Sequence, residues 1–168
     1  MSPASWPDER LLAEPVRVLE GWGLEVGIGR HASAMWGPMA GRDKGRLADV
    51  NAAVRDPRVR AIVATRGGMA SYRIAHQIDF ATLPRDPKPF VAFSDLTNIH
   101  LAIAQQCGVP TVHDCAVGQW SAATGRHLLM ESSPVTLQLD PASVSAAISR
   151  QAASARRSSK VELLGEWP

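Results

Sequence analysis

Cysteine is scarce in this sequence, and charge of one sign does not dominate it. The 168 residues include two cysteines, Cys107 and Cys115, whose spacing matches neither a zinc-binding pattern nor a disulfide framework. We therefore expect a reducing, cytoplasmic setting and no metal site. The 18 basic and 16 acidic residues leave a net charge of +2 and are dispersed, which argues against nucleic-acid binding.

Long apolar runs are also missing. No stretch approaches the roughly 20 apolar residues that a membrane-spanning helix needs. The first ten residues, MSPASWPDER, are polar and unlike a signal peptide, so no association with a membrane is expected. What the sequence does contain is 45% hydrophobic residues, enough to build a core. We therefore expect one domain over residues 1–168.

The central part of the chain alternates between apolar strands and helices. Residues 60–65 and 89–93 are short, near-continuous apolar runs, which are typical of parallel strands buried on both faces. The expected helices cover residues 8–22, 43–55, 71–78, 94–107, 119–130 and 140–155, and the expected strands cover residues 24–28, 60–65, 89–93, 111–112, 135–139 and 161–164. This alternation predicts an α/β domain with a parallel sheet.

Ser94 is the first candidate for chemistry. It follows the buried run 89–93 and opens the next helix, in the segment FVAFSDLTNIH. A serine at such a junction is displayed above the sheet, and the helix N-terminus favours developing negative charge. This is the logic of a nucleophile elbow, although the G-x-S-x-G form is absent. The alternative is that Ser94 is only a helix N-cap, a common role for serine.

The second candidate is the turn Arg66-Gly67-Gly68, which follows the run 60–65. Two glycines after a parallel strand permit close approach of the backbone to a ligand, and free N–H groups there could form an oxyanion hole. The alternative is an ordinary strand-to-helix turn. Because both candidate turns follow parallel strands, we expect them at the same sheet edge, where α/β folds bind ligands.

These turns belong to a set of motifs that occur in a fixed order. The set comprises Ala40-Gly41-Arg42-Asp43 with Arg46 and Asp49, then DPRVRAI at 56–62, Arg66-Gly67-Gly68, PKPF at 87–90, and Phe93-Ser94-Asp95-Leu96-Thr97 with His100. Over about residues 2–113 the set resembles the N-terminal domain of the LD-carboxypeptidase family, which includes muramoyl-tetrapeptide carboxypeptidases and microcin-C immunity peptidases. The resemblance implies a Rossmann-like parallel sheet flanked by helices. Residues 114–168 would then be a divergent extension.

The resemblance also implies roles for particular residues. Ser94 would be the nucleophile, and backbone N–H groups of Gly68 or Met69 and of Asp95 would form the oxyanion hole. Members of the family cleave an amide next to a free carboxylate in peptide-like molecules, and they need no metal or organic cofactor. The other residues expected to line the site are Arg66, Gly67, Thr97 and Cys115.

The chain departs from the family pattern in several ways. It lacks the apolar strand that usually precedes the Ser-Pro segment, so one sheet edge is expected to be open to a partner chain or to residues 161–164. The resemblance leads us to expect that these residues lack the C-terminal domain that supplies the family's catalytic glutamate and histidine, and serine is a weak nucleophile without a base. Met69 and Ala70 stand where the family prefers an aromatic residue and a glycine.

Local substitutes for the missing base are few. His113 and Asp114 follow a neighbouring strand at the same sheet edge, so they could reach Ser94. Cys115 is a second possible nucleophile, although a buried, inert cysteine is more common. His100 lies six residues beyond Ser94 on a helix and is expected to pack away from it.

Three hypotheses about function follow. The first is a truncated serine hydrolase or acyl-transfer enzyme that acts on a peptide-like or carboxylate-bearing small molecule, in a biosynthetic pathway. The second is a repurposed binding protein or non-hydrolytic enzyme that kept the pocket and lost the triad. The third is half of a split enzyme. The open sheet edge favours a homodimer or a partner subunit. We favour the first hypothesis because both motifs around Ser94 are intact.

Overall fold

The computed structural model describes residues 1–8, 10, 12–113, 126–127, 129–130, 136–137 and 161–162, the last two pairs by their backbone alone. Contacts between residues divide the chain into two compact units, Met1–Ala122 and Ala123–Pro168. The first unit contains every described residue that the sequence motifs single out.

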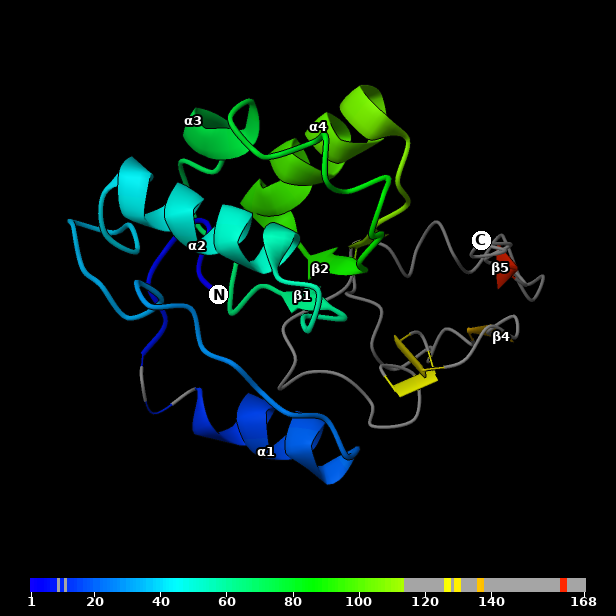
Figure 1. Cartoon of the computed structure of the whole chain (residues 1–168). Coiled ribbons are helices and arrows are strands. Elements are labelled where there is room, and N and C mark those ends of the chain that lie inside the picture. The colour runs from blue at the N-terminus through cyan, green and yellow to red at the C-terminus, as the bar shows by residue number, and fades with distance from the viewer. Residues whose placement is uncertain are drawn as a thin grey trace, which may run out of the picture. The chain divides into compact units, whose positions relative to one another are not determined.

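A parallel sheet lies at the centre of the first unit. Its strands are β1 (Ile62–Val63), β2 (Phe90–Ala92) and β3 (Val112–His113), in that spatial order. All three run in the same direction, so their carboxyl ends meet at one edge of the sheet (Figure 1). The predicted strands are therefore confirmed in position. The pairing covers only the middle of the ranges predicted for β1 and β2, whereas β3 extends one residue beyond the predicted 111–112.

The first residues of the chain lie along the outer edge of β1. The amino group of Met1 donates to the carbonyl of Val63 at 3.1 Å, and the N–H of Thr65 donates to the carbonyl of Met1 at 2.8 Å. The Ser2 and Thr65 hydroxyls are 2.8 Å apart. These residues partly occupy the edge that was expected to be open. The predicted strand at 161–164 pairs instead within the second unit.

Three helices cover one face of the sheet. They are α2 (Asp43–Arg55), α3 (Tyr72–Ala75) and α4 (Thr97–Cys107), and the last is preceded by the 3-10 turn η2 (Ser94–Leu96). The buried core between these helices and the sheet includes Val50, Val54, Ile62, Ala64, Ile74, Leu83, Phe90, Ala92, Leu96, Ile99 and Ile103. This core fixes the positions of the loops that follow β1 and β2.

The helix boundaries follow local sequence signals where those signals are strong. Residues 43–55 were predicted as a helix and form α2, and α4 ends at Gly108, whose φ of +67° is the left-handed conformation that stops a helix. The first helix, α1 (Ala13–Gly21), is shorter than the predicted 8–22, and Pro15 lies in its first turn. In Figure 1, α1 lies apart from the helices that cover the sheet.

The strand predicted at 24–28 is wrong. Leu24, Val26 and Ile28 alternate with polar or glycine positions as in a strand, yet these residues form no ladder with another segment. Ile28 is 58% exposed. Alternation indicates a strand only where a neighbouring edge is available to pair, and the outer edge of β1 is already occupied by Met1.

The described part of the second unit contains an antiparallel pair. Its strands are β4 (Thr136–Leu137) and β5 (Val161–Glu162), which confirms the strands predicted at 135–139 and 161–164. The predicted helix at 140–155 lies outside the described residues, and of the one at 119–130 only 126–127 and 129–130 are described, in helical conformation. No helix in the described part combines the length and apolar character needed to cross a bilayer.

Candidate active site

Ser94 adopts an unusual backbone conformation. It lies directly beyond β2 and Phe93, it is exposed, and its φ is +60°. Among the described non-glycine residues only Ser94 and Ala70 have a positive φ, a region that side chains with a Cβ rarely adopt. The Ser94 hydroxyl makes no helix-capping hydrogen bond, because the capping positions fall on Phe93 and Leu96. The alternative role of Ser94 as an N-cap is therefore not seen.

Gly67 brings the β1–α3 loop against this serine, and Gly68 brings the loop against Ser5. A Cβ at Gly67 would lie 2.7 Å from the Ser94 Cβ and 3.1 Å from its Oγ, so any larger residue would displace the Ser94 side chain. A Cβ at Gly68 would lie 2.0 Å from the Ser5 Oγ, and Gly68 has a φ of +134°. Both positions therefore require glycine, and the Arg-Gly-Gly turn is more than an ordinary connection.

Three backbone N–H groups near Ser94 are free to bind a ligand. Those of Gly68, Met69 and Asp95 donate to no acceptor among the described residues. Gly68 and Met69 follow the glycine that touches Ser94, and Asp95 follows Ser94 itself. Free N–H groups on both sides of a serine can stabilise an oxyanion.

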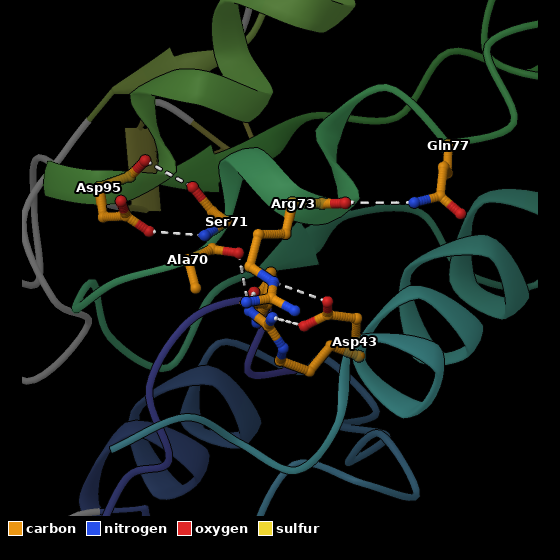
Figure 2. Close-up of polar contacts among 8 residues, drawn as sticks. Asp43, Ala70, Ser71, Arg73, Gln77 and Asp95 are labelled. Carbon is orange, nitrogen blue, oxygen red and sulfur yellow. Dashed lines mark hydrogen bonds and ion pairs between the residues drawn. The ribbon is translucent and has the colours of Figure 1, made fainter. Parts of the chain in front are cut away.

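The Asp95 side chain connects the two loops of the site. Its Oδ2 accepts the Ser71 N–H at 2.9 Å, and its backbone carbonyl accepts the Ser71 hydroxyl at 2.6 Å (Figure 2). The Asn98 amide also donates to that carbonyl, at 2.7 Å. The Thr97 hydroxyl donates to the Ser94 carbonyl at 2.7 Å. Asp95 and Thr97 thus hold the backbone around Ser94 in place.

Two side chains predicted to line the site stand at its rim. Arg66 is exposed, and its guanidinium donates a long hydrogen bond of 3.5 Å to the Trp6 carbonyl. The Met69 side chain is also accessible, with 50% of its surface exposed. Both side chains are available to contact a bound molecule.

His113 is not joined to Ser94 by a hydrogen bond among the described contacts. It is exposed at the end of β3, paired in register with Ala92, and its ring centre lies 5.5 Å from that of His100. Asp114 and Cys115 lie outside the described residues. In the described part of the chain, no three His, Cys, Asp or Glu side chains come together in a way that could hold a metal ion.

His100 packs away from the site, as its helical spacing predicts. Its Nε2 lies 3.1 Å from the Ala92 carbonyl and its Nδ1 lies 2.7 Å from the Thr111 hydroxyl. Burial lowers the pKa of His100 below its ordinary value. The neutral ring therefore donates from Nε2 to Ala92 and accepts at Nδ1 from Thr111, which leaves no ring nitrogen for Ser94.

A buried charged group behind the site belongs to the motif set, although the sequence assigned it no contact with the site. Arg46 is 1% exposed, and its Nη2 donates to Asp43 Oδ1 at 2.5 Å. Burial raises the pKa of Asp43, but hydrogen bonds from Arg73 and Arg46 outweigh it and lower the pKa. The signal in the sequence is position, because Arg46 lies four residues before Val50 on the apolar side of α2.

The parallel sheet, with a left-handed serine and two glycines at its carboxyl edge, defines an α/β domain with a nucleophile-elbow geometry. Residues 1–114 match the model of the LD-carboxypeptidase N-terminal domain family, and the chain belongs to this family. The resemblance seen in the sequence motifs and the predicted fold class are both confirmed.

Two bacterial proteins illustrate the similarity in sequence. The chain is 40% identical over 113 residues to the probable murein peptide carboxypeptidase of Bacillus subtilis, covering 67% of this chain and 35% of the relative. It is 30% identical over 166 residues to the murein tetrapeptide carboxypeptidase of Pseudomonas aeruginosa, covering 98% of this chain and 52% of the relative. The chain thus spans about a third to a half of these relatives.

Solved structures show the same fold. An MccF-like protein from Bacillus anthracis superposes with a TM-score of 0.77 at 23% identity, covering 84% of this chain and 46% of that one. The muramoyltetrapeptide carboxypeptidase of Oxalobacter formigenes superposes with a TM-score of 0.68 at 26% identity, covering 82% of this chain and 50% of that one.

Proposed function

We propose that this chain is the serine-bearing part of an LD-carboxypeptidase-type hydrolase, with Ser94 as the nucleophile. The observation that carries the proposal is the φ of +60° at Ser94 beside Gly67, since a strained, exposed serine at a strand end fits a nucleophile better than a structural residue. The names of the relatives support a peptide-like substrate with a free terminal carboxylate, and a murein tetrapeptide is the first to test.

In the proposed reaction, the Ser94 Oγ attacks the carbonyl carbon of the scissile amide and passes its proton to a base. The oxyanion that forms accepts hydrogen bonds from the N–H groups of Asp95 and of Gly68 or Met69. The amine leaves with a proton, and water releases the acyl group from Ser94. Arg66 stands at the rim with a positive charge that suits a carboxylate-bearing substrate.

The base is the part of the proposal for which the described residues show no hydrogen bond to Ser94. The candidate within the chain is His113, the last residue of β3 beside β2, together with Asp114, the next residue in the sequence. A second copy of the chain or a partner subunit is the other source. The reaction needs no metal or organic cofactor, and a cytoplasmic setting suits a chain with two cysteines.

Labelling with a fluorophosphonate tests whether Ser94 is activated. Intact-mass analysis of the wild-type chain should show one adduct, and Ser94→Ala should show none. Ser33→Ala removes an exposed serine that belongs to neither of the two loops of the site and should label at the wild-type rate. An unlabelled wild-type chain would contradict the proposed nucleophile and favour a pocket that binds without reacting. Wild-type protein that has not been exposed to the probe should also release the terminal residue of a murein tetrapeptide, followed by mass spectrometry, and prior labelling should abolish this release.

A further inference from the structure

The buried side chain of Arg46 binds the β1–α3 loop through hydrogen bonds. One nitrogen of this guanidinium, Nη1, donates to the Pro3 carbonyl at 2.7 Å and to the Ala70 carbonyl at 3.1 Å. Nη2 donates to Asp43, whose other oxygen accepts from Arg73 at 2.7 Å (Figure 2). A single buried side chain of α2 therefore ties the N-terminal segment to the loop that touches Ser94.

The loop residue that Arg46 holds is in a conformation that needs external support. Ala70 has a φ of +69°, and its Cβ makes this left-handed region unfavourable for the isolated residue. Arg46 holds the carbonyl of Ala70, and Asp95 holds the next N–H, that of Ser71, at 2.9 Å. Together these hydrogen bonds fix the peptide unit between Ala70 and Ser71.

The burial of Arg46 is difficult to explain by stability alone. Its Nε is buried and has no hydrogen-bond partner among the described residues, and its one carboxylate partner, Asp43, is 30% exposed. An apolar side chain at this position of α2 would avoid the desolvation of a charge and of the unpaired Nε–H. What an apolar side chain cannot do is donate to the carbonyls of Pro3 and Ala70.

We propose that Arg46 is a positioning residue for the oxyanion-binding loop. By holding Ala70 in the left-handed conformation, it directs the N–H groups of Gly68 and Met69 toward Ser94. This inference deepens the proposed function and rests on it for its chemical readout. Arg46 itself touches no substrate, since it is buried behind the loop.

The test combines Arg46→Lys with Ala70→Gly in the full-length chain. Lysine keeps the charge but loses the planar fork that reaches both carbonyls and Asp43, so the rate of fluorophosphonate labelling should fall at least about 10-fold, within the range for lost oxyanion donors. Glycine adopts a positive φ without strain, so Ala70→Gly should restore the rate of Arg46→Lys to within about 3-fold of wild type. Arg55→Lys, on the exposed side of the same helix, should label at the wild-type rate.

The outcomes separate a positioning role from a structural one. A labelling rate unchanged by Arg46→Lys, or a loss that Ala70→Gly does not reverse, would overturn the inference. Rescue of the labelling rate without recovery of the thermal unfolding midpoint would support it, because added stability could not then explain the rescue. Each variant should be compared with wild type at equal folded concentration.

A second readout keeps this inference separable from the proposed function. The Ser71 amide, which bonds to Asp95, should exchange with deuterium at least about 10-fold faster in Arg46→Lys and regain protection in the double variant. If the wild-type chain does not label, the proposed nucleophile fails and this exchange pattern decides the inference alone. Unchanged protection of Ser71 in Arg46→Lys would contradict it.

Discussion

At the scale of single residues, the site is marked by two left-handed conformations in residues that carry a Cβ. Each such conformation costs about 1–2 kcal/mol in an L-residue, and it persists only where surrounding contacts impose it. Ser94 and Ala70 are supported by Thr97, Arg46 and Asp95, all through backbone carbonyls or N–H groups. Each strained residue therefore has a hydrogen bond on its own carbonyl that helps to hold its conformation.

Gly67→Ala tests how closely the two loops must approach. The added Cβ would lie 2.7 Å from the Ser94 Cβ, so Ser94 must move, and we expect fluorophosphonate labelling to fall by at least about 100-fold, the usual effect of disturbing a nucleophile or oxyanion donor. Gly21→Ala is the matched control, because no atom lies within 4 Å of its added Cβ and the helix end is exposed. Equal labelling rates for Gly67→Ala and wild type would contradict the close approach.

His100 should make the stability of the protein depend on pH. Burial lowers its pKa in the folded state, so above the ordinary value of about 6.5 the ring is neutral in both states and has no effect. As pH falls through that value, the unfolded chain binds a proton that the folded chain resists, and the free energy of unfolding decreases until the folded pKa is passed.

Urea unfolding at pH 7.5 and pH 5.5 measures this dependence. His100→Gln should show a smaller loss of stability between the two pH values than wild type, whereas His76→Gln, at an exposed position, should keep the wild-type difference. The same loss in His100→Gln and wild type would mean that the buried ring is not the group that titrates.

At the scale of helices and strands, a buried lysine joins the end of α2 to the start of β2. Lys88 is 0% exposed, and its Nζ donates to the Val54 carbonyl at 3.0 Å and to Asp86. A cation at the last carbonyls of a helix also interacts favourably with the helix dipole. The segment that leads into β2, and so to Ser94, is anchored here.

Lys88→Met should remove this anchor. We expect a loss of about 2–4 kcal/mol in the free energy of unfolding, because the Val54 carbonyl and Asp86 lose a buried partner while Asp86 keeps Arg60. Lys44→Met changes an exposed lysine of α2 and should stay within about 0.5 kcal/mol. Urea denaturation of wild type, Lys88→Met and Lys44→Met measures these differences in the free energy of unfolding. A Lys88→Met variant as stable as wild type would show that the hydrogen bonds of Lys88 are dispensable.

The elements that could be predicted from the sequence are those with a local signal, such as a helix stop or a continuous apolar run. Asp56-Pro57 and Gly108 mark the ends of α2 and α4, and the apolar runs before Arg66 and Ser94 mark β1 and β2. The strand expected at 24–28 failed because pairing depends on a neighbour that periodicity cannot reveal. A continuous apolar run or a helix stop signal thus locates an element, whereas alternation alone does not show whether a pairing edge exists.

The position of the site in the fold could be predicted from the sequence, whereas its detailed geometry could not. The motifs placed Ser94, Gly67 and Asp95 at one sheet edge, and the parallel strands confirm that placement. The φ of Ser94 and the contact of Gly67 with it follow from loop geometry that no spacing encodes. The contacts of Arg46 could not be predicted, because a charged residue on a helix is usually exposed. Its role follows from its burial, which only the structure shows.

At the scale of the whole molecule, the described core belongs to one part of the chain. All of its buried residues lie between Ala4 and Val109, within the unit Met1–Ala122. The family model ends in the same region, at residue 114. The candidate site therefore depends on contacts of the first unit, whereas the sequence was interpreted as one domain over residues 1–168.

A fragment of residues 1–122 tests which description holds. The fragment contains the described core, and about 120 residues are enough to bury a stable core. We therefore expect the fragment to unfold cooperatively in urea, with a midpoint close to that of the unfolding transition of Met1–Ala122 in the full chain. Tryptophan fluorescence follows the transition, since Trp6, Trp22 and Trp36 all lie in the fragment. If the fragment is unfolded, or if the full chain unfolds in a single transition at a much higher midpoint, residues 123–168 are part of one cooperative domain with the site. A stable fragment that also labels at Ser94 would instead place the reactive serine and whatever activates it within the first unit.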